Sequence, residues 1–316
     1  MKTKLEKVFI LNLFKFLQLL NLFNSQISAV KALTKQLDKS VYLICKDHTV
    51  SGEKFELIFN SEKEMLVTSP KPDIEILPEY YKSEAYISHT DSKKSFTDKI
   101  YQQVKKIMLL KKLKWIEKKY PEKGSLLDIG AGTGEFLFEA KKRGWKVKGI
   151  EPDEKARKLA LEKGIKLAEN SSHFKSKKFD VISLWHVFEH VYDIETQIIE
   201  LEQLLKKDGL LIIAVPNFKS YDAKYYREFW AAYDVPRHLS HFSQNSFKHL
   251  FSKTGFKLID SKPLIFDSYY VSLLSEKYKT GSTNFLKAGY IGYKSNLKAK
   301  FNSEYSSITY FFRKTD

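Results

Sequence analysis

The sequence predicts an α/β protein with a mostly parallel sheet, because short apolar runs alternate with segments of helical character. Residues 125–127 form the first apolar run, and a glycine-rich loop joins them to a predicted helix over residues 136–142. Residues 145–151 form a second strand with apolar alternation. The same alternation of strand and helix continues in three later segments, at residues 178–185, 195–205 and 209–216.

The loop after the first strand reads Asp128-Ile-Gly-Ala-Gly-Thr-Gly134. Glycines at alternate positions let the backbone approach a ligand, and the following helix points its N-terminus at that ligand. The dinucleotide fingerprint G-x-G-x-x-G needs its third glycine where this chain has Glu135. An acid at position 128 would repel a pyrophosphate, but it suits the ammonium and sulfonium groups of S-adenosylmethionine (SAM). We therefore predict a SAM loop that comprises Asp128, Gly130, Ala131, Gly132 and Gly134.

The second strand ends in a carboxylate, Glu151, which Pro152 follows. This acid lies near the twenty-residue offset at which such folds place a carboxylate on ribose hydroxyls. An ionised carboxylate accepts both hydroxyl protons, so we predict that Glu151 and Pro152 help to bind the cofactor. The alternative is a glycine-rich turn with a chance surface glutamate.

With these residues, the chain resembles class I SAM-dependent methyltransferases over about residues 100–260. Segments 178–190 and 209–217 resemble the family's fourth and fifth strands with the loops that follow them. The resemblance implies a Rossmann-like seven-stranded, mostly parallel sheet with helices on both faces and an antiparallel last strand pair. Beside this pattern, we expect residues 218–242 and 267–299 to form insertions after strand five and between strands six and seven. Glu169 occupies the place of the family's adenine-binding acid.

Composition limits the possible partners. The single cysteine, Cys45, excludes a disulfide framework and leaves no thiol in the catalytic domain for cytosine-C5 methylation. The net charge of +16 comes almost entirely from lysine, which is less suited than arginine to bidentate phosphate contacts. We expect the basic helix over residues 103–119 to pack on the sheet, and we expect no nucleic-acid partner. A reducing compartment and an intracellular cofactor favour the cytoplasm.

We expect three parts along the chain. Residues 1–40 form a peripheral helix or an extension outside the fold, with a signal peptide as the alternative. No membrane span is expected, because polar residues interrupt the apolar stretch at every third position from Asn12 to Asn21. Residues 41–95 form a small β element and a segment that covers the cofactor, which resembles a zinc-knuckle region without most of its ligands. No metal is therefore expected, and residues 96–316 form the methyltransferase domain.

Candidate catalytic residues follow the fourth strand. His186 and His190 lie where a base would reach the methyl acceptor, and histidine titrates near neutrality. A structural or capping role for His190 and a place beside the cofactor for His186 remain open. Candidate acceptor-binding residues lie before the core and in the aromatic insertion after strand five, where the alternative is burial in a local core: Tyr80, Tyr81, Tyr233, Arg237, His238 and His241.

Together these features predict a SAM-dependent methyltransferase that acts on an oxygen or carbon atom of a small molecule. The sequence leaves two alternatives open, a catalytically silent SAM-binding or scaffold protein and an RNA methyltransferase. An NAD-linked oxidoreductase would need the glycine spacing that is missing here. The sequence does not identify the acceptor or the oligomeric state.

Overall fold

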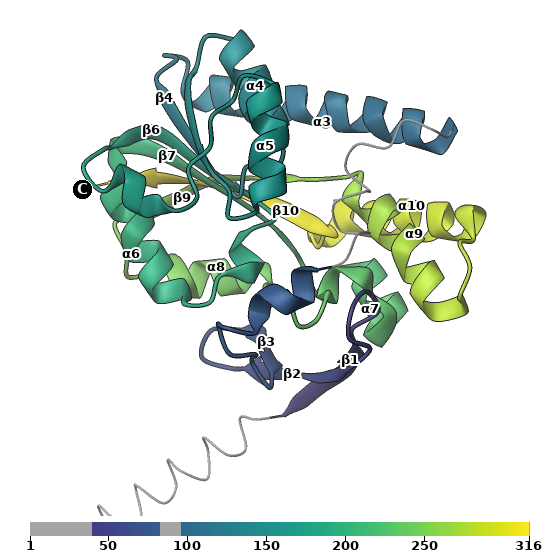
Figure 1. Ribbon diagram of the computed structural model, residues 1–316. Helices are drawn as coiled ribbons and strands as arrows, with labels where there is room; N and C mark the ends of the chain where they lie inside the picture. The colour runs from purple at the N-terminus through teal and green to yellow at the C-terminus, as the bar shows by residue number, and fades with distance from the viewer. Residues whose placement is uncertain (1–39, 83–95, 316) are drawn as a thin grey trace, which may run out of the picture.

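The computed structural model describes residues 40–82 and 96–315 (Figure 1). Residues 1–39 of the predicted extension (1–40) and residues 83–95 of the predicted small module with its cofactor-covering segment (41–95) lie outside the described residues. No helix in the described part of the chain is long and apolar enough to cross a membrane.

The central sheet has six strands in the order β5-β4-β6-β7-β10-β9. The first four strands are parallel neighbours, and β10 pairs antiparallel with both β7 and β9. The predicted mostly parallel sheet with an antiparallel last pair is therefore confirmed. The strands span Ser125–Ile129 (β4), Lys146–Ile150 (β5), Phe179–Trp185 (β6), Leu205–Pro216 (β7), Phe256–Pro263 (β9) and Ser307–Lys314 (β10).

The expected seventh strand is reduced to one isolated parallel bridge between Ile150 and Ala168. Ala168 donates its N–H to Gly149 and accepts the N–H of Glu151, but no further ladder bonds follow. Two residues later, the side chain of Asn170 caps the short 3₁₀ helix η2 (Ser171–Phe174). The chain turns away too soon after the bridge to form a strand, because this cap begins a helix.

Helices cover both faces of the sheet, as predicted (Figure 1). Leu126 packs with the helices on one face, and the next residue, Leu127, packs with those on the other, as the pleat of a strand requires. The first face carries α3 (Phe96–Lys119), α4 (Glu135–Lys142) and α5 (Glu154–Glu162). The second face carries α6 (Ile194–Leu204) and α8 (Gln244–Phe251). The basic helix α3 thus packs against the sheet through Leu113 and Ile116, as expected.

A second, smaller sheet forms beside the central one, in the order β1-β2-β3-β8. The predicted β element is present in β1 (Val41–Lys46) and β2 (Lys54–Asn60), and β3 (Met65–Ser69) extends it. The fourth strand, β8 (Ser240–His241), comes from the later part of the chain. The short helix η1 (Leu77–Tyr81) follows β3 in the sequence, and its Tyr80 ring packs against Phe55 of β2.

Both predicted insertions are present. The one after β7 contains α7 (Tyr221–Tyr226) and the 3₁₀ helices η4 (Arg227–Phe229) and η5 (Ala231–Tyr233). Its aromatic residues pack against the small sheet, where Trp230 and Tyr233 join Phe55 and Leu57 in one buried cluster. The second insertion is a helical hairpin between β9 and β10, formed by α9 (Asp267–Thr280) and α10 (Phe285–Asn302).

Candidate functional site

The three loop glycines are required for different reasons. Gly130, Gly132 and Gly134 have φ values of 68°, 51° and 74°, a region that side chains disfavour. A Cβ on Gly130 would lie 2.3 Å from Val187 Cγ2, and one on Gly134 would lie 2.9 Å from Ala160 Cβ. A Cβ on Gly132 would meet no heavy atom within 4 Å. Two glycines therefore allow close packing, whereas Gly132 faces open space.

The Glu151 carboxylate is fixed beside this open position. Its Oε2 accepts the backbone N–H of Gly132 at 2.8 Å, and its Oε1 accepts that of Asp153 at 3.0 Å. Burial raises the pKa of Glu151, while these two N–H groups lower it. The strand end and the glycine loop thus hold one carboxylate in a defined orientation.

Asp128 lies at the base of the loop and is 3% exposed. Ser183 donates its hydroxyl to Asp128 Oδ1 at 2.6 Å. Burial raises the pKa of Asp128 to about 7, although the Ser183 hydrogen bond and the Lys112 charge oppose the shift. Lys112 Nζ lies 4.2 Å from the centre of the Trp185 ring. Asp128 is therefore a carboxylate whose ionisation is unfavourable until a further cation approaches.

The remaining predicted cofactor residues lie along the same edge of the sheet. Ala131 donates its N–H to Ile150 O at 2.9 Å, which ties the loop to β5. Pro152 follows Glu151 and accepts a hydrogen bond from Arg157 through its carbonyl. Glu169 is exposed and directly follows the bridge residue Ala168.

His186 is held between two carboxylates. Its Nε2 lies 2.9 Å from Asp267 Oδ2, and its Nδ1 lies 3.4 Å from Glu189 Oε1. Burial lowers the pKa of His186, but both carboxylates raise it, and the balance is a pKa of about 9. His186 is therefore a cation at neutral pH and has no free lone pair with which to accept a proton.

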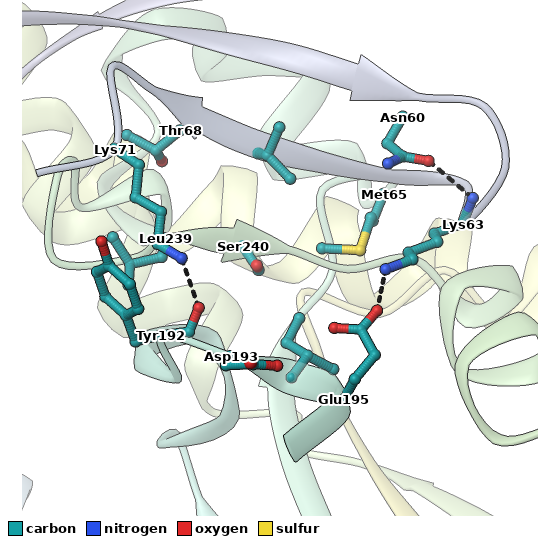
Figure 2. Close-up of a pocket in the computed structure, with 12 residues that line it drawn as sticks. Asn60, Lys63, Met65, Thr68, Lys71, Tyr192, Asp193, Glu195, Leu239 and Ser240 are labelled. Atoms are coloured by element: carbon teal, nitrogen blue, oxygen red, sulfur yellow. Dashed lines mark hydrogen bonds and ion pairs between the residues drawn. The ribbon is translucent and has the colours of Figure 1, made fainter. Parts of the chain in front are cut away.

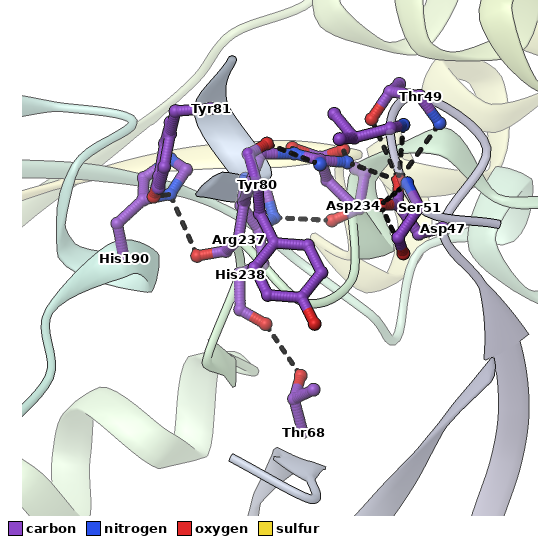
Figure 3. Close-up of polar contacts among 12 residues, drawn as sticks. Asp47, Thr49, Ser51, Thr68, Tyr80, Tyr81, His190, Asp234, Arg237 and His238 are labelled. Atoms are coloured by element: carbon purple, nitrogen blue, oxygen red, sulfur yellow. Dashed lines mark hydrogen bonds and ion pairs between the residues drawn. The ribbon is translucent and has the colours of Figure 1, made fainter. Parts of the chain in front are cut away.

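His190 has the opposite character. Its Nδ1 lies 3.0 Å from Arg237 O and 2.9 Å from the Tyr81 hydroxyl. Figure 3 draws these three residues together. Because a carbonyl only accepts, Nδ1 carries the proton and Nε2 keeps its lone pair. Burial, followed by the nearby His238, lowers the pKa of His190 to about 4. His190 is therefore neutral at physiological pH and can accept a proton.

Arg237, expected to contact the acceptor, is fully occupied by protein groups and is 2% exposed. It pairs with Asp47 at 3.0 Å and with Asp234 at 2.6 Å, and it donates to Tyr80 O at 3.0 Å (Figure 3). The Tyr80 hydroxyl in turn donates to Glu53 at 2.8 Å. Arg237 therefore joins the small sheet and η1 to the later insertion.

The other predicted acceptor residues divide into two groups. Tyr233 and His241 are 2% and 4% exposed, and His241 Nε2 lies 3.0 Å from Thr68 Oγ1. His238 is 9% exposed, and its Nδ1 donates to Ala232 O at 2.9 Å. The His238 ring lies 4.6 Å from that of His190, centre to centre. The structure thus brings His238 and Tyr81 to His190, whereas Tyr233 and His241 lie in the surrounding core.

Three side chains of metal-binding type meet in the described part of the chain. Glu189, His190 and His238 each place one donor atom within 4.8 Å of the others. The Glu189 carboxylate is 1% exposed and, apart from its ion pair with His186, lacks a hydrogen-bond partner. A tetrahedral zinc ion with bonds of about 2.1 Å needs donors about 3.4 Å apart. A separation of up to 4.8 Å between donor atoms is wider than the zinc spacing, so these three residues by themselves do not define a bound ion.

A separate pocket of about 390 Å³ lies between the small sheet and the start of α6 (Figure 2). Lys71 and Tyr192 line one end, where Lys71 Nζ lies 3.5 Å from the Tyr192 ring centre. Lys63 and Glu195 form an ion pair at the other end. None of the predicted cofactor or acceptor residues lines this pocket.

Three charged residues of the site were not identified from the sequence, because no local pattern marks them as functional. Asp267 lies at the start of α9, about eighty residues after the His186 that it binds. Lys112 lies within the basic helix α3, and Asp47 pairs with an arginine 190 residues away. Only the folded arrangement brings these charges to the site.

Comparisons with known proteins are consistent with this geometry. A family profile described as a methyltransferase domain matches residues 102–261, about half of the chain. A ubiquinone biosynthesis O-methyltransferase of Pelagibacter ubique is 39% identical over 106 residues, which cover 30% of this chain and 44% of that protein. An uncharacterized methyltransferase of Alkaliphilus oremlandii is 31% identical over 109 residues, which cover 33% and 50%. The chain therefore spans about half the length of these curated relatives.

Solved structures with a similar overall fold include a methyltransferase crystallised with its product. The magnesium protoporphyrin IX methyltransferase of Synechocystis, crystallised with bound SAH, superposes with a TM-score of 0.52 at 14% sequence identity. The match covers 77% of this chain and all of the other. At this identity the likeness concerns the fold, and it agrees with the sheet order and the helices on both faces.

Proposed function

The chain belongs to the methyltransferase-domain family, and on that premise we propose that it transfers a methyl group from SAM to a small-molecule acceptor. The observation that carries the proposal is the Glu151 carboxylate held against Gly132 N–H, beside a glycine position that opens into free space. This arrangement leaves lone pairs of Glu151 for two ribose hydroxyls. It also leaves room for the cofactor against the loop backbone.

Asp128 supplies the second cofactor contact in this proposal. SAM carries an ammonium and a sulfonium, and either positive charge would favour the ionised form of a carboxylate whose pKa is about 7. A pyrophosphate would meet an additional negative charge at the same place. Asp128 and Glu151 therefore act together, one on the charge of the cofactor and one on its ribose.

The chemistry is an in-line displacement, for which the cofactor supplies the electrophilic methyl group. The acceptor atom forms a bond to the methyl carbon while the carbon–sulfur bond breaks, and the sulfur leaves as a neutral thioether. The protein positions the two reactants and excludes water. A base is needed only when the acceptor carries a proton, and that proton passes to the base.

We assign the base role to His190 rather than to His186. His190 is neutral with an unprotonated Nε2, whereas His186 is already protonated at neutral pH. A base with a pKa of about 4 is weak, so it suits an acceptor whose proton is already acidic. Phenols and enols keep their proton at neutral pH and are more acidic than aliphatic alcohols, and they offer an oxygen or a carbon nucleophile. The similarity to a ubiquinone biosynthesis O-methyltransferase supports oxygen as the acceptor atom.

Transfer of a tritiated methyl group from SAM into fractionated extract of the source cells tests the proposal. We expect label in the small-molecule fraction and a loss of that label with His190→Ala. Label in RNA would replace the proposal with RNA methylation. SAM binding without labelled product in any fraction would favour the silent SAM-binding protein. A cytoplasmic location is proposed with this function, because SAM is an intracellular metabolite.

A further inference from the structure

The outer face of α10 carries an unusual row of large apolar side chains. The inner face of the helix buries Ala288, Ile291 and Ala299. On the outer face, Leu286 is 89% exposed and Phe301 is 87% exposed. Three further members of the row are 40–58% exposed. We call this row the α10 stripe, and it consists of Leu286, Tyr290, Tyr293, Leu297 and Phe301.

The spacing of the stripe places its members on one side of the helix. Steps of four, three, four and four residues keep them within an arc of about 80°, at about 100° per residue. The described part of the chain has nineteen exposed large apolar side chains, and six of them lie on this one helix. Isolated exposed apolar residues are ordinary, but a continuous row marks an interaction surface.

Lysines border the stripe, and α10 contains no acidic residue. Lys287, Lys294 and Lys298 each follow a stripe member by one residue, and Lys300 lies on the other border. Lys287 pairs with Glu276 of α9 at 3.3 Å. Lys294 and Lys298 lie over the Tyr221 ring at 5.3 and 4.5 Å from its centre. In the described residues, no carboxylate forms an ion pair with Lys294, Lys298 or Lys300, so their charge is available to a partner.

We propose that the α10 stripe docks on an anionic lipid bilayer. Phenylalanine and leucine side chains enter the boundary between headgroups and acyl chains, tyrosine lies at the headgroup level, and lysine attracts acidic lipids. A second copy of the chain is a poor occupant, because it would bring a second row of unpaired lysines against the first. The net charge of +16 adds a long-range attraction to a negative surface.

The surface connects to the candidate site through one helical hairpin. Asp267, the first residue of α9, bonds His186, and α9 packs along α10 (Figure 1). Docking is a separate property from methyl transfer, so either can be tested without the other.

Vesicle sedimentation with the full chain tests the proposal. Vesicles of pure phosphatidylcholine are compared with vesicles that contain about 30% phosphatidylserine. Each comparison is made at low salt and at about 0.5 M salt, because the higher salt screens surface charges over a few ångströms. We expect partition into the anionic vesicles to exceed that into neutral ones by at least about tenfold and to fall with salt. No binding to anionic vesicles at low salt would overturn the proposal.

Two pairs of variants locate the binding. Leu286→Ser with Phe301→Ser should lower partition into anionic vesicles at least about tenfold, because it removes the two most exposed apolar side chains. The matched control is Leu161→Ser with Ile199→Ser, two exposed residues on α5 and α6 that should leave partition unchanged. These positions are exposed, so circular dichroism should show all variants folded.

The same variants exclude other occupants. Unchanged binding of Leu286→Ser with Phe301→Ser would place vesicle binding elsewhere in the chain and overturn the assignment to α10. Analytical ultracentrifugation of the wild type provides a second check. A dimer that the same substitution dissociates would identify a second copy as the occupant, and that result would also overturn the proposal.

Discussion

Replacing Asp128 with asparagine should make the protein more stable while it weakens SAM binding. Asparagine has nearly the shape of aspartate, and its oxygen can still accept the Ser183 hydroxyl. It has no charge, so it avoids the unfavourable ionisation of a carboxylate that is 3% exposed. The substitution therefore separates the contribution of this residue to the fold from its contribution to the ligand.

The size of the effect follows from the pKa of Asp128. Burial raises this pKa from 3.8 to about 7, so the folded state keeps its proton while the unfolded state has lost it. The contribution of protonated Asp128 to stability is fully present below the unfolded pKa and is lost as the pH rises through the folded pKa. Between pH 5 and pH 8 the wild type loses this contribution, so the advantage of Asp128→Asn grows by about 3 kcal/mol.

Urea unfolding of both proteins at pH 5 and pH 8, without SAM, measures this change. The comparison between the two pH values cancels any constant packing effect of the new amide. An equal difference in free energy of unfolding at both pH values would contradict a raised pKa of Asp128 in the folded state.

Asp180→Asn provides a control of opposite sign. Burial would raise the pKa of Asp180, but hydrogen bonds from Ser125, Lys206 and Tyr120 hold it below its usual range. Its stabilising contribution is present above the unfolded pKa and is lost as the pH falls. Asp180→Asn should therefore be less stable than the wild type at pH 8, by a margin that shrinks in acid.

Four further substitutions test the loop, the buried ion pairs and the proposed base. Gly132→Ala should weaken SAM binding at least about tenfold in calorimetry and lower stability by only about 1–2 kcal/mol, since its Cβ meets only open space. Gly130→Ala should destabilise more, because its methyl group would clash with a valine at 2.3 Å. Arg237→Ala should lower the free energy of unfolding by about 3–5 kcal/mol, because it leaves two carboxylates unpaired. His190→Ala should slow methyl transfer at least about a hundredfold with unchanged SAM affinity; equal rates would remove it as the base.

The parts of the fold that the sequence predicted depend on local patterns. Glycines at alternate positions with an acid before them are a local signal, and their positive φ values confirm why glycine is needed. Short apolar segments that alternate with helical segments likewise predicted β4, β5, β6 and β7 as strands of a mostly parallel sheet. The reduction of the expected seventh strand to one bridge at Ala168 has a local cause as well, because the Asn170 cap begins a helix two residues later.

The arrangement around the histidines depends on contacts between distant segments. No local pattern in the sequence links Arg237 to Asp47, yet this buried ion pair gives the arginine a structural role. The charge of His186 depends on Asp267, a residue of a later insertion. Two histidines four positions apart therefore reach opposite protonation states, which their spacing in the sequence did not predict.

The most direct test of the account is isothermal titration of SAM into the wild type, Asp128→Ala and Glu151→Ala. We expect a dissociation constant in the micromolar range for the wild type and no measurable binding for either variant. Glu154→Ala, a fully exposed acid on α5, is the matched control and should bind SAM normally. Undiminished binding in both Asp128→Ala and Glu151→Ala would contradict the assignment of the cofactor site.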